Sequence, residues 1–309
     1  MDGIFGNGKI DQISSFVNDI FQNSSNEAEI NPQVQIFPQV DVCDGNRSEL
    51  LNLPGSAYVK ITEGCNNHCS FCAIPIIRGE LRSRSVSKII EEIKSLLTRG
   101  IFEINLIGQD LASYGKGKNE STEVLASFNS ETSPLATLLS EISKLTGDFW
   151  IRLLYIHPDN FPQDILPVIA NDKRILPYFD IPFQSGSSEV LKSMNRTGTQ
   201  ESYAELVKNI RGELEASTIR TTFLCGFPGE SDKNAKETET FLKEIEPDWS
   251  GCFAYSREED TAAYNMKNQV PTKKAEKRAE KLVEIQSVIT ENRLKQHIGK
   301  IYKVLVEEI

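Results

Sequence analysis

Three cysteines lie within the eight residues Cys65-Asn66-Asn67-His68-Cys69-Ser70-Phe71-Cys72. Thiolates are the ligands of iron–sulfur clusters, and clusters that only transfer electrons take four of them. A loop that offers three thiolates therefore indicates a cubane cluster whose fourth iron stays open to another molecule. We expect Cys65, Cys69 and Cys72 to bind such a [4Fe-4S] cluster.

Zinc and a disulfide are the alternative interpretations of the same cysteines. Structural zinc takes four nitrogen or sulfur ligands, usually from two separated pairs, whereas only His68 accompanies this trio. A disulfide suits neither the spacing nor a chain whose other cysteines are scattered. Those others are Cys43, Cys225 and Cys252, of which the last two fall in predicted strands and are interpreted as core residues.

The composition indicates a soluble globular protein. The chain has 309 residues, of which 39% are hydrophobic and 25% charged, and its net charge is −10. Such acidity argues against a broad nucleic-acid-binding face, which normally appears as a basic domain. No apolar run approaches the ~20 residues that a membrane span needs. We therefore expect a cytoplasmic protein with no membrane partner.

Strand and helix patterns alternate downstream of Tyr58. Apolar runs at 57–62, 101–108, 149–156, 178–183, 218–227 and 249–255 predict short buried strands. Apolar residues at helical spacing predict a helix that begins at Val86 and stops at Gly100, and a second that starts at Ser133-Pro134. They also predict a third helix over 203–214 and a long one over 272–297. The polar stretch 116–133 is interpreted as a surface insertion. Repeated strand–helix units predict an α/β fold with parallel strands and right-handed crossovers, in a closed or partly closed barrel.

The Cys-x3-Cys-x2-Cys loop, with Phe71 before its last cysteine, resembles the signature of the radical S-adenosylmethionine (SAM) superfamily. The resemblance implies a partial (β/α)6 TIM-like barrel with SAM chelated at the open iron. Reductive cleavage of SAM then gives a 5′-deoxyadenosyl radical, and Phe71 is expected to pack beside the cofactor. No catalytic acid or base is predicted, because hydrogen abstraction by a carbon radical needs none.

Residues around the cysteines narrow this resemblance. Glu63-Gly64-Cys65, Pro75, Arg78-Gly79 and Ser83-Arg84 resemble the corresponding block of the methylthiotransferases, although Ser85 stands at the family's usual proline. One branch of that family modifies an aspartate of a small-subunit ribosomal protein, and the other an adenosine of transfer RNA. The segments 109–115 and 255–264 resemble the ribosomal-protein branch, with Asp260 at its usual glycine. A transfer-RNA enzyme and a non-catalytic remnant remain the alternatives.

Two further segments are expected to contact SAM. Gly226-Phe227-Pro228-Gly229-Glu230 resembles the family's adenine-binding element, and Gln184-Ser185-Gly186-Ser187 resembles its Q-S-G-S element. A tight turn and a helix cap are the respective alternatives. The predicted cofactor-binding residues are Phe71, Gln109, Gln184, Ser185, Gly226, Phe227 and Gly229. Arg78, Arg84 and Arg196 are candidates for carboxylate recognition, and His157 and His297 are interpreted as structural.

The resemblance also predicts the domain organisation and the partners. We expect a remnant of an N-terminal methylthiotransferase domain over 1–21 and a linker over 22–56. The radical SAM core is expected over 57–297, and the start of a TRAM domain over 298–309, with a strand at 303–307.

The family carries a second [4Fe-4S] cluster on three further cysteines, but only Cys43 precedes Tyr58. We therefore expect a chain truncated at both ends that cleaves SAM only. Expected partners are SAM, the ribosomal protein and an electron donor such as flavodoxin or ferredoxin, with transfer RNA only under the alternative.

Overall fold

The computed structural model describes residues 3–5, 12–23, 33–35, 50 and 54–308, and the chain divides into two compact units, 1–46 and 47–309. In the first unit β1 (Gly3–Phe5) pairs in parallel with β2 (Gln33–Gln35), and α1 (Ile13–Asn23) lies between them in sequence. The helix agrees with the apolar spacing of that segment. Strand β2 lies in the stretch predicted as a linker, because a three-residue strand has too few residues to show a period. Residues 24–32, 36–49 (with Cys43) and 51–53 of that predicted linker lie outside the described residues.

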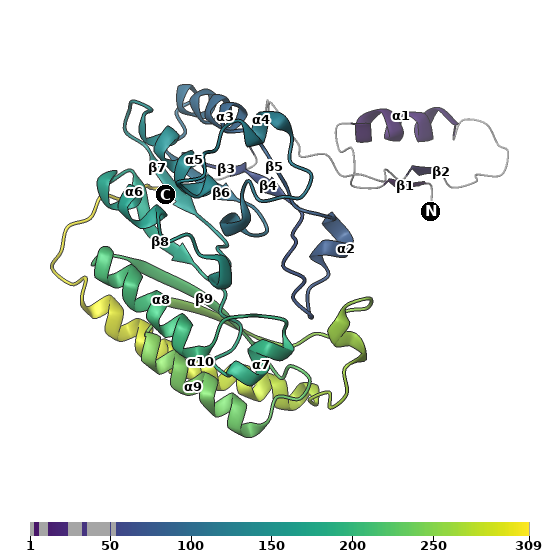
Figure 1. Cartoon of the computed structure of the whole chain (residues 1–309), viewed down its shortest axis with the longest axis vertical. Coiled ribbons are helices and arrows are strands. Elements are labelled where there is room, and N and C mark those ends of the chain that lie inside the picture. Colours follow the sequence, from purple (N-terminus) through teal and green to yellow (C-terminus); the bar gives the residue numbers. More distant parts are fainter. Residues whose placement is uncertain (1–2, 6–11, 24–32, 36–49, 51–53, 309) are drawn as a thin grey trace. The chain divides into compact units, whose positions relative to one another are not determined.

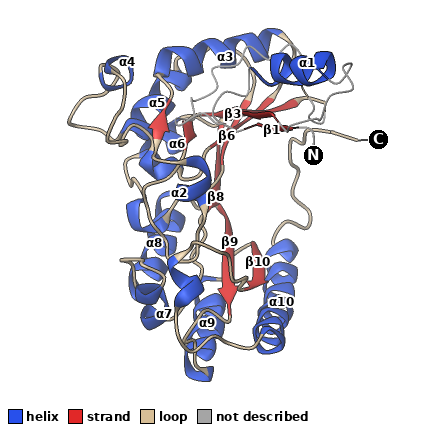
Figure 2. Cartoon of the chain, turned by 90° about the vertical axis from the view of Figure 1, so that its right-hand side faces the viewer, coloured by secondary structure: helices blue, strands red, loops and turns tan. Residues whose placement is uncertain are grey.

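The second unit is built on one sheet of six parallel strands (Figures 1 and 2). These are β3 (Ser56–Lys60), β6 (Glu103–Ile107), β7 (Trp150–Leu153), β8 (Ile175–Asp180), β9 (Thr218–Cys225) and β10 (Trp249–Ala254). Their order in the sheet, β10-β9-β8-β7-β6-β3, follows the chain, so each crossover leads to the neighbouring strand. Strands β3 and β10 form the two edges. The predicted partial (β/α)6 barrel is confirmed.

Helices join the strands, and their starts are encoded locally. Ser85 and Ser133 accept hydrogen bonds from the first turns of α3 (Val86–Thr98) and α5 (Pro134–Ser143). Thr199 and Ser231 form capping boxes at α8 (Gln200–Glu213) and α9 (Asp232–Ile245). The other helices are α2 (Ile74–Arg78), α4 (Thr122–Leu125), α6 (Ile165–Asn171), α7 (Ser188–Ser193) and α10 (Thr272–Lys295). Helix α9 escaped prediction because its apolar residues gather at its C-terminal end.

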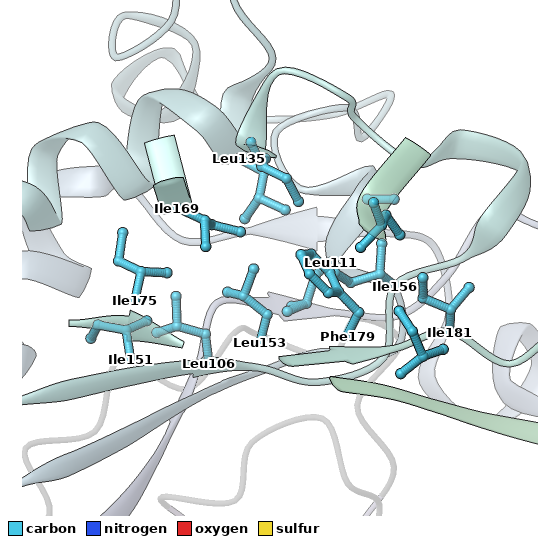
Figure 3. Packing of buried hydrophobic residues seen from close by; sticks show 14 of the residues in the cluster. Leu106, Leu111, Leu135, Ile151, Leu153, Ile156, Ile169, Ile175, Phe179 and Ile181 are labelled. Atoms are coloured by element: carbon cyan, nitrogen blue, oxygen red, sulfur yellow. The ribbon is translucent and has the colours of Figure 1, made fainter. Parts of the chain in front are cut away.

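The two faces of the sheet differ in character. Alternate strand residues pack against the helices in the main core, as the sticks of Figure 3 show for Leu106, Ile151, Leu153 and Phe179. The intervening residues give the other face a polar surface. There the Arg152 guanidinium binds both carboxylate oxygens of Glu103, at 2.7 and 3.2 Å. Period-two alternation therefore gives the barrel a dry outer layer and a charged inner face.

Two sequence predictions differ from the structure in the second unit. The stretch 116–133 contains α4, and Phe128 packs edge-on against Tyr114, so the insertion is partly tied to the core. The predicted strand at 303–307 is wrong: the described residues there form no strand. A strand needs a neighbour for its ladder hydrogen bonds, and here Lys303 instead pairs with Asp148 at 2.6 Å.

A helix that crosses a membrane needs about 20 mostly apolar residues. Within the part of the chain that the structure describes, no helix combines the length and the apolar character needed to cross a bilayer.

Candidate functional site

The cysteine loop leaves the sheet at a tightly built corner. It follows β4 (Thr62–Glu63), which comes directly after β3 and pairs in antiparallel fashion with β5 (Arg82–Ser83). Gly64 has φ +74°, and a Cβ there would lie 2.2 Å from the carbonyl oxygen of Glu80. The Cys65 N–H then donates to the Gly79 carbonyl at 3.2 Å. Close contact with the returning chain therefore fixes where the loop begins.

Replacing Gly64 by alanine is expected to destabilise the protein and reduce its iron content. The side chain would clash with backbone and hold a left-handed conformation, together costing at least about 2 kcal/mol. Gly79→Ala is the matched control, since Gly79 has φ +73° but nothing within 4 Å of the added Cβ. Denaturant unfolding measures the difference. Equal destabilisation by the two variants would show that the close approach at Gly64 is unimportant.

Asp110 connects the loop to the ends of two strands. Asp110 is 2% exposed. Oδ2 accepts hydrogen bonds from the Asn67 side chain at 2.8 Å and from the Ser113 hydroxyl at 2.5 Å. Oδ1 accepts from the backbone N–H groups of Ala112 and His157, at 2.9 and 3.0 Å. This single carboxylate therefore joins the cysteine loop, the segment after β6 and the segment after β7.

Further contacts fix the second half of the loop. The Ser70 N–H donates to the Met194 carbonyl at 3.1 Å, and the Ser70 hydroxyl donates to the Ser193 carbonyl at 2.9 Å. The Asn195 side chain donates to the His68 carbonyl at 2.9 Å. These partners lie at the end of α7. The loop is thus held by several elements of the second unit and not only by its own turns.

Phe71 turns toward a small apolar cluster beside the main core. The cluster consists of buried Val190, Met194, Phe227 and Ala263, against which Phe71, Leu224, Tyr255 and Met266 pack. The Phe227 ring meets the Tyr255 ring edge-on at 5.6 Å. Phe71 and Phe227, which were predicted separately as cofactor contacts, therefore belong to one cluster next to the cysteines.

The three thiols share a half-buried environment. Burial, with the charges of Asp110 and of the other two cysteines, raises the pKa of Cys65 to about 11. Burial also raises the pKa of Cys69, against the opposing charge of Arg196. Thiolates that repel one another in a partly dry loop need a compensating cation. The donor set therefore fits an iron–sulfur cluster, although no group of three His, Cys, Asp or Glu side chains in the described ranges already forms a metal-binding arrangement.

His157 lies against the cysteine loop. The sequence analysis interpreted it as a structural residue and did not predict this position. Its Nε2 is 3.7 Å from the Sγ of Cys69. Burial, helped by the charge of Arg196, lowers the pKa of His157 to about 4. The sequence signal that could have found it is its place just after a predicted strand, because barrel chemistry lies at the C-terminal ends of strands.

The three candidate arginines have different surroundings. Arg84 is buried and already paired, since its Nη1 is 2.6 Å from the Glu92 carboxylate and 2.8 Å from the Lys60 carbonyl. Arg78 lies 3.7 Å from the Glu63 carboxylate. Arg196 is buried beside the cysteine loop, donates to the Pro182 carbonyl at 2.8 Å, and has no hydrogen-bond partner at Nε. Arg196 is therefore the best placed of the three for a ligand carboxylate.

The other predicted cofactor residues lie at the C-terminal ends of the strands. Gln109 is exposed after β6. Gln184, with φ +70°, continues the pairing of β8 with β9 through its backbone. The Ser185 hydroxyl is buried, contacts the Thr238 hydroxyl at 3.2 Å and accepts from the Ser187 N–H, so it is already engaged in attaching α9. Contact of these residues with SAM stays a prediction.

The segment after β9 is a tight turn around a carboxylate. Glu230 accepts hydrogen bonds from the backbone N–H groups of Gly226 and Phe227. Gly226 has φ +78°, and a Cβ there would lie 2.2 Å from the Cβ of Ala275 on α10. Gly229, with φ +84°, has open space where a Cβ would lie. The segment is therefore a tight turn, which was the alternative interpretation of its sequence, and it leaves open space at Gly229. Its contact with SAM also stays a prediction.

Residues 59–242 match the family model of the Radical SAM superfamily. The chain therefore belongs to that superfamily, whose cofactors are SAM and an iron–sulfur cluster of the [4Fe-4S] type. Solved structures agree in fold: TsrM, a radical SAM methyltransferase from Kitasatospora setae, aligns over 68% of this chain and 36% of its own, with a TM-score of 0.54 at 17% identity. Coproporphyrinogen III oxidase (HemN) from Escherichia coli aligns over 78% of this chain and 54% of its own, with a TM-score of 0.50 at 18% identity.

Curated relatives define the family more narrowly. The chain is 50% identical over 315 residues to the ribosomal protein uS12 methylthiotransferase RimO of Treponema denticola, covering 100% of this chain and 67% of that protein. It is 38% identical to RimO of Syntrophomonas wolfei, covering 99% of this chain and 66% of that protein, and 40% identical to RimO of Aquifex aeolicus, covering 84% and 57%. The chain belongs to the RimO family, as the ribosomal-protein branch of the resemblance predicted. It spans about two thirds or less of the length of these relatives.

Proposed function

We propose that the protein inserts a methylthio group at the β-carbon of an aspartate in ribosomal protein uS12, a reaction in which this chain supplies the cleavage of SAM. The observation that carries this proposal is the 50% identity to a RimO enzyme over the whole of this chain. Within that alignment, the segments 109–115 and 255–264, which resemble the ribosomal-protein branch, also support it. A cytoplasmic location is part of the proposal, because the substrate is a ribosomal protein.

Cys65, Cys69 and Cys72 are proposed to hold the catalytic cluster. When bound, the cluster and SAM supply a 5′-deoxyadenosyl radical that removes a hydrogen atom from the substrate carbon. The chain's own residues hold the cysteine loop in place through Asp110, Asn67 and Ser70. The apolar side chains packed around Phe71 keep water away from the iron–sulfur cluster, as radical chemistry requires.

SAM is proposed to lie along the C-terminal ends of the strands, where barrel enzymes bind their substrates. Gln109, Gln184, Ser185, Gly226, Phe227 and Gly229 are its proposed contacts, with the buried Arg196 guanidinium as a further candidate. A flavodoxin or ferredoxin is the proposed electron donor. We further propose 57–297 as the radical SAM core, because the family model matches 59–242 and α10 packs on β9 and β10.

Deleting the gene in its own cell is expected to remove the methylthio group from uS12. Mass spectrometry of the ribosomal proteins reads this loss directly, and analysis of transfer-RNA nucleosides from the same cells is the control. Returning the wild-type gene restores the modification, whereas a Cys69→Ala gene does not. A uS12 mass that is unchanged by the deletion, or a loss confined to a transfer-RNA adenosine, would contradict the proposal.

A further inference from the structure

One imidazole is aimed at one cysteine of the loop. The distance from His157 Nε2 to Cys69 Sγ, 3.7 Å, suits an N–H···S hydrogen bond. His157 is 8% exposed, and Cys69 is half-buried. Of the three histidines in the chain, His68 is an exposed member of the loop itself, and His297 contacts the Tyr302 hydroxyl instead.

The position of the proton on the His157 ring follows from the other nitrogen. Nδ1 accepts a hydrogen bond from the backbone N–H of Asp159 at 3.3 Å. A neutral imidazole carries its hydrogen on only one nitrogen, so a ring whose Nδ1 accepts must carry the hydrogen on Nε2. That hydrogen lies on the nitrogen that faces Cys69. The tautomer is thus assigned by the hydrogen-bond geometry.

The backbone around His157 keeps the ring in this orientation. Its N–H donates to the buried Asp110 carboxylate at 3.0 Å, the same carboxylate that anchors Asn67 of the cysteine loop. Pro158 follows and begins a short 3-10 turn over Pro158–Asn160, which brings the Asp159 N–H back to Nδ1. The donor and the cysteine loop are therefore positioned by one shared anchor.

We propose that His157 is a positioning residue that donates its Nε2–H to the Cys69 thiolate and thereby raises the reduction potential of the bound cluster. Hydrogen bonds to the sulfurs of an iron–sulfur cluster help to set its potential, because a donor stabilises the more negative, reduced state. The inference rests on the proposed function, since it takes Cys69 as a ligand. It adds a residue that tunes the electron-accepting step.

The tautomer can be tested without any cluster. Nitrogen–proton correlation spectra of the metal-free protein should show the hydrogen of His157 on Nε2. An assignment of that hydrogen to Nδ1 would overturn the inference, because the ring could then only accept from its surroundings at Nε2.

The potential is tested in the anaerobically reconstituted protein by a redox titration followed with electron paramagnetic resonance. His157→Leu removes the donor, and His157→Gln keeps an N–H donor on a side chain of similar reach. We expect His157→Leu to shift the reduction equilibrium about tenfold toward the oxidised state, which corresponds to 59 mV for one electron. His157→Gln should recover part of that shift. His297→Leu, at a histidine that contacts Tyr302, should leave the potential unchanged.

The outcomes separate this inference from the proposed function. If the wild-type protein binds no [4Fe-4S] cluster, the proposed function fails and the inference fails with it. If the cluster binds but its potential is the same with His, Gln and Leu at position 157, only the inference is overturned. Should the leucine variant not fold, His157→Met, which also lacks a donor, replaces it in the same titration.

Discussion

Replacing any one of Cys65, Cys69 and Cys72 by alanine is expected to remove the catalytic cluster and to reduce the release of 5′-deoxyadenosine from SAM below detection. In the proposed site each iron held by the loop would have one protein thiolate, so the loss of one cysteine would leave an iron with no protein ligand. This effect is larger than the ~10 to 100-fold loss typical of residues that only support a ligand. Iron and sulfide content and the amount of 5′-deoxyadenosine measure it.

The alanine variants should still fold. The three thiols are only half-buried, and the loop is held by the side chains of Asn67 and Ser70. Cys252→Ala is the matched control, because Cys252 is also half-buried but lies in β10 and contacts the Ser250 hydroxyl. It should retain iron and SAM cleavage. A loop-cysteine variant that keeps full iron content and wild-type cleavage would refute the assignment of its cysteine as a ligand.

Replacing Asp110 by asparagine is expected to destabilise the protein by about 2–4 kcal/mol and to impair its retention of the cluster. The carboxylate accepts four hydrogen bonds in a buried position. The NH2 group of asparagine cannot accept hydrogen bonds, so the donors that face it would lose their acceptor. Because Asn67 and His157 are among these donors, the cysteine loop and the segment after β7 should loosen together.

Denaturant unfolding and iron content measure the effect of the Asp110 substitution. Asp148→Asn is the control: its side chain is 71% exposed and pairs with Lys303, and exposed pairs of this kind contribute about 0–1 kcal/mol. Unfolding of the Asp110 variant at the wild-type denaturant concentration, with full iron content, would show that this carboxylate does not organise the site.

Much of the fold could be predicted from local sequence. Parallel strands buried by helices on one side appear as apolar runs, so the predicted runs coincide with the six strands of the barrel to within a few residues. Apolar residues at helical spacing marked α3 and α5. Helix α9 and strand β2 could not be found in this way, because one has apolar residues only near its end and the other owes its form to pairing with β1.

In the candidate site, too, local features could be predicted from the sequence and long-range contacts could not. The cysteine loop was predictable because its three ligand residues are close in sequence. The hydrogen bond from Asn67 to Asp110 and the approach of His157 to Cys69 were not, because they join residues 43 and 88 positions apart that only the folded sheet brings together. For Ser185 the motif predicts a contact with SAM, which stays a prediction, whereas the contact of its hydroxyl with Thr238 of α9 could be found only from the fold.

The most direct test of the account is Mössbauer spectroscopy of the protein reconstituted anaerobically with isotopically enriched iron, recorded with and without SAM. The account predicts a [4Fe-4S] cluster in which three irons are unaffected by SAM and one iron changes its spectrum when SAM binds. A spectrum in which none of the four irons changes when SAM is added, or a protein that takes up only a single tetrahedral zinc, would contradict it.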